Sequence, residues 1–184
     1  MMKKQTKFLE AGKIYLRPYK EEDLDIIEYG KNNPDVRETL FLFNPQTRSD
    51  VEHEIETWLN DKSTALFTIC ENKTNQPVGQ TALFRIDYVS RAAIFYIAIY
   101  DPVYWSKGYG KEATELMLKY SFDILNLNRI QLHVSVENER GVKAYEKNGF
   151  KIEGTLREAM YHNNKYVDFY VMGILRKDYY IKQN

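Results

Sequence analysis

The most constraining feature of the sequence is an apolar run that leads, through a short connection, into an amphipathic stretch. Residues Ala92 to Tyr100 are almost continuously apolar, as expected for a strand that is covered on both faces. Asp101-Pro102 ends the run, and after Gly108 and Gly110 the apolar residues recur at helical spacing. A buried strand and a helix in this order need neighbouring strands and packed layers, which predicts a domain that mixes helices and strands.

The first third of the chain predicts one strand and two helices. Residues 14–18 indicate a short edge strand, because Pro18 cannot donate a hydrogen bond to a neighbouring strand. The acidic stretch 21–29 predicts a short helix. Ser49, followed three residues later by Glu52, matches a capping box and predicts that a second helix begins there.

The rest of the chain predicts further strands and one compact helix. Asn138 is a good helix N-cap and Gly149 a good helix end, so a helix is expected between them. The predicted strands span residues 65–70, 78–86, 129–136, 150–155 and 166–175. This order predicts one domain over residues 1–184 with an α/β (α+β) fold, in which a mixed, mostly antiparallel central sheet is flanked by helices on both faces.

Composition excludes several classes of function. The chain holds 26 basic and 26 acidic residues, so its net charge of zero supplies no electrostatic reason to expect a nucleic acid or an anionic membrane as partner. Its single cysteine, Cys70, forms neither an internal disulfide nor a Cys-based metal site, which predicts a cytoplasmic protein without a metal. Residues Met1 to Glu10 contain no apolar run long enough for a signal peptide or a membrane span.

The segment around the two glycines is the best candidate for a ligand site. Glycines let backbone N–H groups approach a ligand closely, and a helix start adds partial positive charge, so this junction suits a pyrophosphate. Lys107 and Lys111 would add charge at its rim. The third glycine of a dinucleotide site and the Gly-Lys-Ser/Thr of a Walker loop are both missing, which disfavours NAD and ATP. On these grounds alone, a phosphate site and a simple tight turn both stay open.

Three sequence blocks resemble the GNAT N-acetyltransferases. Trp105 to Gly110 fits their Gln/Arg-x-x-Gly-x-Gly/Ala signature except at the first position, where Trp also occurs in the ribosomal-protein acetyltransferase branch. Residues 138–150 resemble the downstream block that ends in Tyr-x-Lys-x-Gly-Phe, and Leu16 to Leu24 resembles the opening of the same branch. The blocks cover nearly the whole chain in the family's order, and the likeness is strongest to spermidine N-acetyltransferases and their neighbours.

The resemblance implies an acetyl-CoA-dependent transfer of an acetyl group to a primary amine. It implies that Tyr145 is the general acid that protonates the coenzyme A thiolate, and that the pantetheine arm lies along the strand of residues 98–100. The implied coenzyme-binding residues are Ala98, Ile99, Tyr100, Trp105, Ser106, Lys107, Gly108, Tyr109, Gly110, Lys111, Asn138 and Lys147.

The general base is not identified by the sequence. Many members of the family have a glutamate on the strand before the pyrophosphate loop, but Phe95 occupies that position here. A water chain, a carboxylate from the first two helices or His133 are the alternatives. Glu112 is interpreted as a favourable first-turn acid rather than a catalyst.

The acceptor also stays open at this point. The acidic first helices would suit a polyamine such as spermidine, although runs of this kind are usually solvated helix faces. Phe95 in place of an acid fits a flatter, aromatic acceptor site equally well, together with the tyrosines at positions 88, 96, 100, 104 and 161. An amino sugar, a peptide or protein N-terminus and an amine antibiotic are therefore alternatives. A non-catalytic coenzyme A-binding module is the rival from another class. A homo-oligomer, formed through Tyr-rich edges and the C-terminal strand, is a further expectation.

Overall fold

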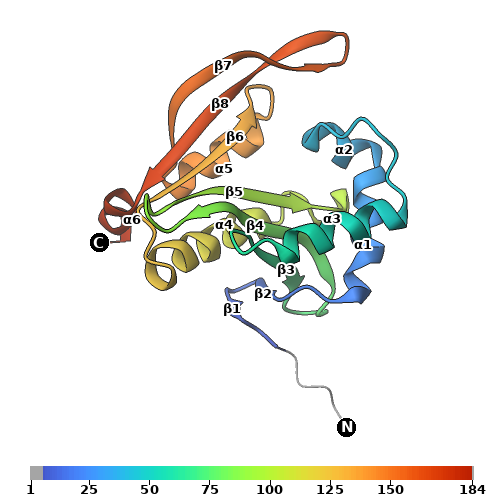
Figure 1. Cartoon of the computed structure of the whole chain (residues 1–184), viewed down its shortest axis with the longest axis horizontal. Helices are drawn as coiled ribbons and strands as arrows, with labels where there is room; N and C mark the ends of the chain where they lie inside the picture. The colour runs from blue at the N-terminus through green and yellow to red at the C-terminus, as the bar shows by residue number, and fades with distance from the viewer. Residues whose placement is uncertain (1–5, 184) are drawn as a thin grey trace. The chain divides into compact units, whose positions relative to one another are not determined.

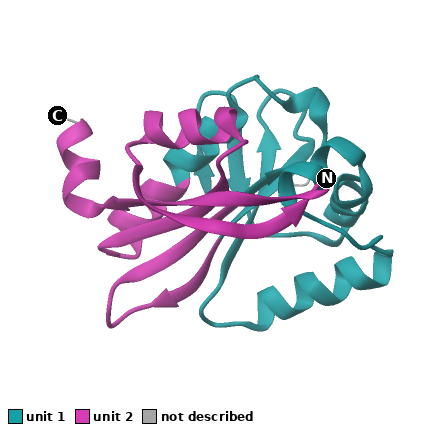
Figure 2. Cartoon of the chain, turned by 90° about the horizontal axis from the view of Figure 1, so that it is seen from above, with its two compact units in different colours: residues 1–82, 97–116 teal, residues 83–96, 117–184 magenta. Residues whose placement is uncertain are grey.

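The computed structural model describes residues 6–183. The prediction that residues 1–10 contain no signal peptide therefore falls partly outside the described residues. The chain divides into two compact units (Figure 2): residues 1–82 with 97–116, and residues 83–96 with 117–184. One domain over the whole chain therefore stays a prediction. No helix of the described part is both long and apolar enough to cross a membrane.

Eight strands follow the order β1-β2-β3-β4-β5-β6-β8-β7 in one sheet (Figure 1). Neighbours β1–β2, β2–β3, β6–β8 and β8–β7 pair antiparallel, whereas β5 and β6 pair in parallel. The predicted mixed, mostly antiparallel sheet is confirmed. The strands are β1 (Leu9–Glu10), β2 (Ile14–Arg17), β3 (Ala65–Glu71), β4 (Pro77–Asp87), β5 (Ala92–Ile99), β6 (Arg129–Ser135), β7 (Lys151–His162) and β8 (Lys165–Leu175).

Within the first unit, β2 is not the edge strand that the sequence predicted. The short strand β1 pairs outside it, with Leu9 opposite Leu16, so β2 lies between β1 and β3. All four residues of β2 are buried. The guanidinium of Arg17 is compensated there by the buried carboxylate of Asp23, with nitrogen–oxygen distances of 2.6 and 2.7 Å, and the Thr68 hydroxyl donates to the same carboxylate at 2.7 Å.

The helices of the first unit begin differently from the prediction. Helix α3 (Arg48–Asn60) begins two residues before the predicted position, because Thr47 is the N-cap and Asp50 completes the capping box, not Ser49 and Glu52. The expected acidic helix consists of η1 (Glu21–Asp23) and α1 (Leu24–Asn32). Helix α2 (Pro34–Leu40) follows with Asn33 as its N-cap and was not predicted.

The second unit follows the sequence patterns closely. In β6, Ile130, Leu132 and Val134 are buried and His133 is exposed, as the alternation predicted. Helix α5 (Glu139–Asn148) has the predicted caps. Strand β7 is longer than expected and turns into β8 through Asn163-Asn164, whose positive φ values of 48° and 62° suit a tight hairpin turn. A C-terminal helix, α6 (Arg176–Gln183), was not predicted.

Candidate functional site

The predicted pyrophosphate loop connects β5 to helix α4 (Tyr109–Lys119) through η2 (Pro102–Tyr104). Its backbone enters the left-handed region twice, with φ of 60° at Ser106 and 88° at Gly108. Alternation of this kind turns successive N–H groups toward a common side, the geometry of an anion-binding nest. The first N–H groups of α4 lack intrahelical acceptors, so they add donors at the same place.

The two glycines of the loop have different roles in the backbone. Gly108 adopts a φ that is strained for any residue with a side chain. Gly110 does not, and a Cβ placed on it would meet no atom within 4 Å. The conformation of the loop therefore requires only Gly108, whereas Gly110 leaves open space beside the backbone.

The two lysines of the loop also differ. The ammonium of Lys107 lies 5.3 Å from the centre of the Tyr104 ring, in a cation–π contact, and its charge also interacts with the carboxylate of Glu71. Lys111 forms an ion pair with Glu115 one turn later, at 2.8 Å. Lys107 is thus better suited than Lys111 to supply positive charge to an anionic ligand.

Side chains that bond the loop to its own unit fix its conformation. The Trp105 indole donates to the carbonyl of Ile99 at 3.1 Å, so the tryptophan at the first motif position bonds the loop to the end of β5. The hydroxyl of Tyr109 donates to Glu71 Oε1. This hydrogen bond raises the pKa of Tyr109 to about 12 and lowers that of Glu71.

The last residues of β5 and Tyr100, which follows it, are packed tightly by small neighbours. Ala98 is buried, and a Cβ at Gly79 would lie 2.1 Å from its carbonyl oxygen. The Tyr100 hydroxyl donates to Gln80 Oε1 at 2.9 Å, and its N–H donates to the carbonyl of Val78 at 3.0 Å. The N–H of Tyr100 is therefore already engaged, as is the carbonyl of Ile99 through the Trp105 indole.

In the second unit, helix α5 positions Tyr145. The helix begins at its N-cap Asn138, whose Oδ1 accepts from the N–H of Gly141 at 3.0 Å. It ends at Gly149, which adopts a left-handed φ of 99°. The side chain of Lys147 is exposed, and its carbonyl accepts a hydrogen bond from the Lys182 ammonium. Asn138 thus has a local capping role, whatever it binds in addition.

Aromatic rings surround Tyr145 within the second unit. Phe95 packs edge to face against it with ring centres 6.3 Å apart, and Phe150 lies at 5.8 Å. No residue in the described range 6–183 forms a hydrogen bond with its hydroxyl. Tyr145 is half-buried, and desolvation raises its pKa to about 12, because a low-dielectric environment disfavours the phenolate. Tyr145 is therefore a neutral phenol at neutral pH.

The positions considered for the general base differ in their exposure and in their partners. Phe95, where many GNAT sequences have a glutamate, is buried and supplies apolar surface to Tyr145. His133 is exposed on β6. Glu112 is half-buried in the first turn of α4, and its Oε2 accepts from the backbone N–H of Lys13 at 2.8 Å. Glu112 thus has a structural partner, in agreement with its interpretation as a first-turn acid.

The sequence analysis missed two residues that contact the loop. Glu71 lies 38 positions before its partner Tyr109, and Lys13 lies 94 positions before Lys107, to whose carbonyl its ammonium donates. Neither belongs to a motif, and no local pattern announces contacts over such separations. Only the pairing of β2 with β3 brings the turn before β2 close to the end of β3.

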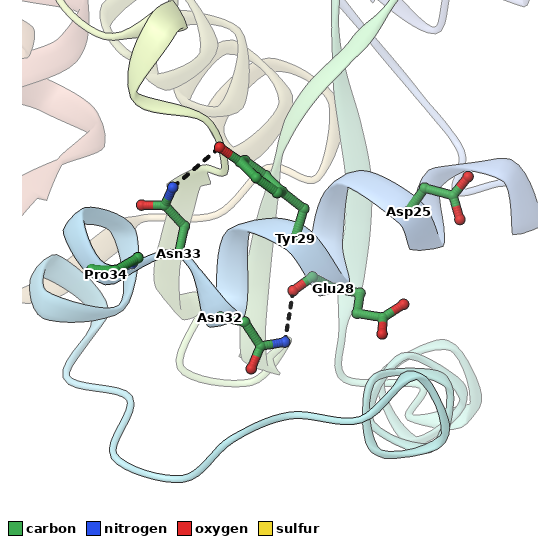
Figure 3. A pocket seen from close by; sticks show the side chains of 6 residues that line it. All are labelled: Asp25, Glu28, Tyr29, Asn32, Asn33 and Pro34. Carbon is green, nitrogen blue, oxygen red and sulfur yellow. Dashed lines mark hydrogen bonds between the residues drawn. The ribbon is translucent and has the colours of Figure 1, made fainter.

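An open hollow of about 520 Å³ lies along helix α1 in the first unit (Figure 3). The Asn33 amide donates to the Tyr29 hydroxyl at 3.2 Å on one side of the helix. The carboxylates of Asp25 and Glu28 lie 2.7 and 3.5 Å from the Arg48 guanidinium, which offsets part of their charge. The hollow is lined by Asp25, Glu28, Tyr29, Asn32, Asn33 and Pro34.

Metal chemistry was not expected from the sequence. Within residues 6–183, no three His, Cys, Asp or Glu side chains gather in a way that could hold a metal ion.

Comparison with known proteins gives a consistent result. The profile of the acetyltransferase (GNAT) domain matches residues 13–151. A spermidine N(1)-acetyltransferase of Vibrio cholerae is 33% identical over 168 residues, which cover 91% of this chain and 96% of the relative.

Solved structures agree with this similarity. A crystal structure of spermidine N-acetyltransferase from Vibrio cholerae in complex with CoA and spermine matches with a TM-score of 0.83 and 33% identity, covering 91% of this chain and 98% of that one. A dodecameric structure of spermidine N-acetyltransferase from Vibrio cholerae matches with a TM-score of 0.78 and 30% identity, covering 93% and 98%.

Proposed function

The chain belongs to the acetyltransferase (GNAT) family and is an acetyl-CoA-dependent N-acetyltransferase, and we propose that its acceptor is a polyamine such as spermidine. The observation that carries the proposal is the 33% identity to a spermidine N(1)-acetyltransferase over nearly the full length of both chains. A likeness of this extent covers the helices and loops that surround the acceptor as well as the coenzyme motif.

We propose that the loop of residues 105–111 binds the pyrophosphate of acetyl-CoA. Its left-handed residues and the first turn of α4 present backbone N–H groups, and Lys107 adds positive charge. The pantetheine arm pairs with the backbone of Ala98 and Ile99, so that a strand N–H polarises the thioester carbonyl; a donor of this kind contributes about 2.7–4 kcal/mol to the transition state. Asn138 and Lys147 are assigned to the coenzyme on the resemblance alone.

We assign the protonation of the leaving group to Tyr145. The neutral acceptor nitrogen attacks the thioester carbon, the tetrahedral intermediate collapses, and the C–S bond breaks. The departing thiolate takes the phenolic proton of Tyr145, and the acceptor nitrogen loses its proton to solvent or to a base. The raised pKa keeps the phenol protonated at neutral pH but makes it a weaker acid than the thiol that it would protonate, so the assignment is supported by the position of Tyr145 in the family motif and not by its pKa.

A cationic acceptor is compatible with the first unit. Asp25 and Glu28 line the hollow along α1 and carry negative charge toward it (Figure 3). The Arg48 guanidinium reduces but does not cancel this charge, because it also lies 3.5 Å from Glu52 and so is shared among three carboxylates. A protonated amine of a polyamine would gain ion pairs here, whereas an uncharged sugar would not.

The test is thiol release from acetyl-CoA with a panel of acceptors: spermidine, spermine, an amino sugar nucleotide, and a peptide with a free N-terminus. Turnover with spermidine or spermine, with mass spectrometry identifying the monoacetylated product, is the expected result. Turnover with only the sugar or the peptide would overturn the polyamine assignment and leave the reaction class intact. Coenzyme binding without turnover on any acceptor would favour a non-catalytic coenzyme A-binding module.

We further propose that the chain assembles as a homo-oligomer. The support is a structural match to a dodecameric spermidine N-acetyltransferase, which covers 98% of the chain of that protein. Light scattering on the purified protein measures the mass directly. A single species at the mass of one chain would refute this assignment without affecting the catalytic one.

A further inference from the structure

We propose that Lys13 is a positioning residue for the pyrophosphate of acetyl-CoA, because it sets the orientation of the peptide bond between Lys107 and Gly108. The proposal rests on the function proposed above for the loop. Lys13 lies in the turn between β1 and β2 and belongs to none of the family's motifs.

Two hydrogen bonds connect Lys13 to the loop and to the helix that follows it. Its ammonium donates to the carbonyl oxygen of Lys107 at 2.8 Å, and its backbone N–H donates to Glu112 Oε2 at 2.8 Å. A Cβ built on Gly108 would lie 3.3 Å from the same ammonium, so the lysine lies directly against the glycine. Lys13 therefore holds the loop at the position whose backbone conformation favours glycine.

The direction of this contact determines where the next N–H group points. In a trans peptide the carbonyl and the N–H of the following residue point in opposite directions. Since the Lys107 carbonyl is directed at the Lys13 ammonium, the N–H of Gly108 is directed away from it. Without this contact, the peptide could rotate and present its carbonyl oxygen to the ligand, which would repel a phosphate.

The positive charge of Lys13 also favours a bound phosphate. No carboxylate of the described chain lies within ion-pair distance of its ammonium, whose partner is a neutral carbonyl. The lysine thus adds positive charge behind the loop, beside that of Lys107, while the carboxylate of Glu112 accepts from its backbone N–H. This charge favours a bound anion and is screened by salt.

The turn that carries Lys13 is itself held in place. The carbonyl of Lys13 accepts from the N–H of Asn72 at 2.8 Å, and the Asn72 amide donates to the carbonyl of Ala11 at 2.8 Å. Asn72 directly follows β3, where Glu71 binds Tyr109. The lysine therefore extends from a fixed turn rather than from a free segment, as positioning requires.

The experiment compares Lys13→Met, which removes donor and charge at similar length, with Lys13→Arg, which keeps both. Lys62→Met, at an exposed lysine between α3 and β3, is the matched control. Steady-state kinetics, calorimetric binding of CoA at two salt concentrations and the melting temperature are measured for all three and the wild type. We expect Lys13→Met to raise the KM for acetyl-CoA and the Kd for CoA about tenfold, because a charged hydrogen bond is lost.

The other measured quantities distinguish a positioning role of Lys13 from a role in the stability of the fold. For Lys13→Met we expect kcat, the KM for the acceptor and the melting temperature to stay near wild type, with the defect smaller at high salt and Lys13→Arg largely restoring binding. Unchanged coenzyme binding in Lys13→Met would overturn the proposal, as would an equal defect in Lys62→Met or a matching loss of kcat and thermal stability. If the wild type itself failed to bind CoA, the proposed function would fall first and this inference with it.

Discussion

Tyr109 and Tyr145 have the same raised pKa of about 12 for opposite reasons. In Tyr109 the main cause is a hydrogen bond to the carboxylate of Glu71, so the proton is held by a partner. In Tyr145 the cause is burial among aromatic rings, and none of residues 6–183 accepts the proton. The same raised pKa therefore has two different physical causes, and its value alone does not identify a proton donor.

The surroundings of the two tyrosines differ in the same way. The loop in the first unit is held by polar contacts from residues distant in sequence, such as Glu71 and Lys13. Tyr145 in the second unit is held by ring packing against Phe95 and Phe150. Fixed donors suit the binding of an anion, whereas an apolar setting suits the storage of a proton.

The largest expected effect separates the two tyrosines directly. Tyr145→Phe removes the proposed acid, so kcat should fall about 100-fold, the lower range for general acid catalysis. The KM for acetyl-CoA and the melting temperature should change little, because no hydrogen bond within residues 6–183 is lost. Tyr109→Phe is the control and should retain kcat. Equal kcat losses in the two variants would remove the distinction drawn between them.

A second prediction tests the loop through its glycines. Gly108→Ala places a side chain at a φ of 88°, which costs about 1–2 kcal/mol and should raise the KM for acetyl-CoA about tenfold. Gly110→Ala has open space and no positive φ, so its KM should stay within about twofold of wild type if the site needs only the backbone conformation. A larger defect in Gly110→Ala would mean instead that the ligand occupies the space beside it.

A smaller effect is expected from Glu71→Gln. The neutral amide is a weaker acceptor for Tyr109, so the free energy of unfolding at neutral pH should fall by about 1 kcal/mol or less, after allowance for solvent screening. The pKa of Glu71 is lowered in the folded state, so this stability is present above its unfolded pKa of about 4.3 and is lost as pH falls through the folded value. Denaturant unfolding near pH 7 and pH 3 measures it; a difference that persists at the lower pH would contradict an ionic origin.

The smallest effect is an absence of change. Since the pKa of Tyr145 is raised to about 12, its ionisation should not reduce kcat between about pH 8 and pH 10. The pH profile of kcat at saturating substrates checks this. An alkaline decline with a midpoint below about pH 10, absent in the residual activity of Tyr145→Phe, would show that the phenol ionises more easily than its surroundings imply.

Sequence patterns predicted the local elements of the site well. The alternation in β6, the caps of α5 and the glycine at the start of α4 all depend on neighbours within a few residues, where spacing carries the information. One prediction was wrong because a neighbouring pair of residues fits the same pattern: Thr47 and Asp50 form the capping box in place of Ser49 and Glu52. Strand β2 was predicted to be an edge because of Pro18, but Pro18 follows the strand, and the two-residue strand β1 that pairs with it is too short to produce a sequence pattern.

The sequence by itself determined the kind of fold, the motif that identifies the family, and the position of Tyr145. The tertiary structure decided which groups hold these residues and in what state. Lys13 and Glu71 reach the loop because strand pairing brings distant segments together, and Phe95 raises the pKa of Tyr145 because the two rings pack in the second unit. Periodicity and spacing record local conformation, whereas dielectric surroundings and long-range hydrogen bonds exist only once the chain is folded.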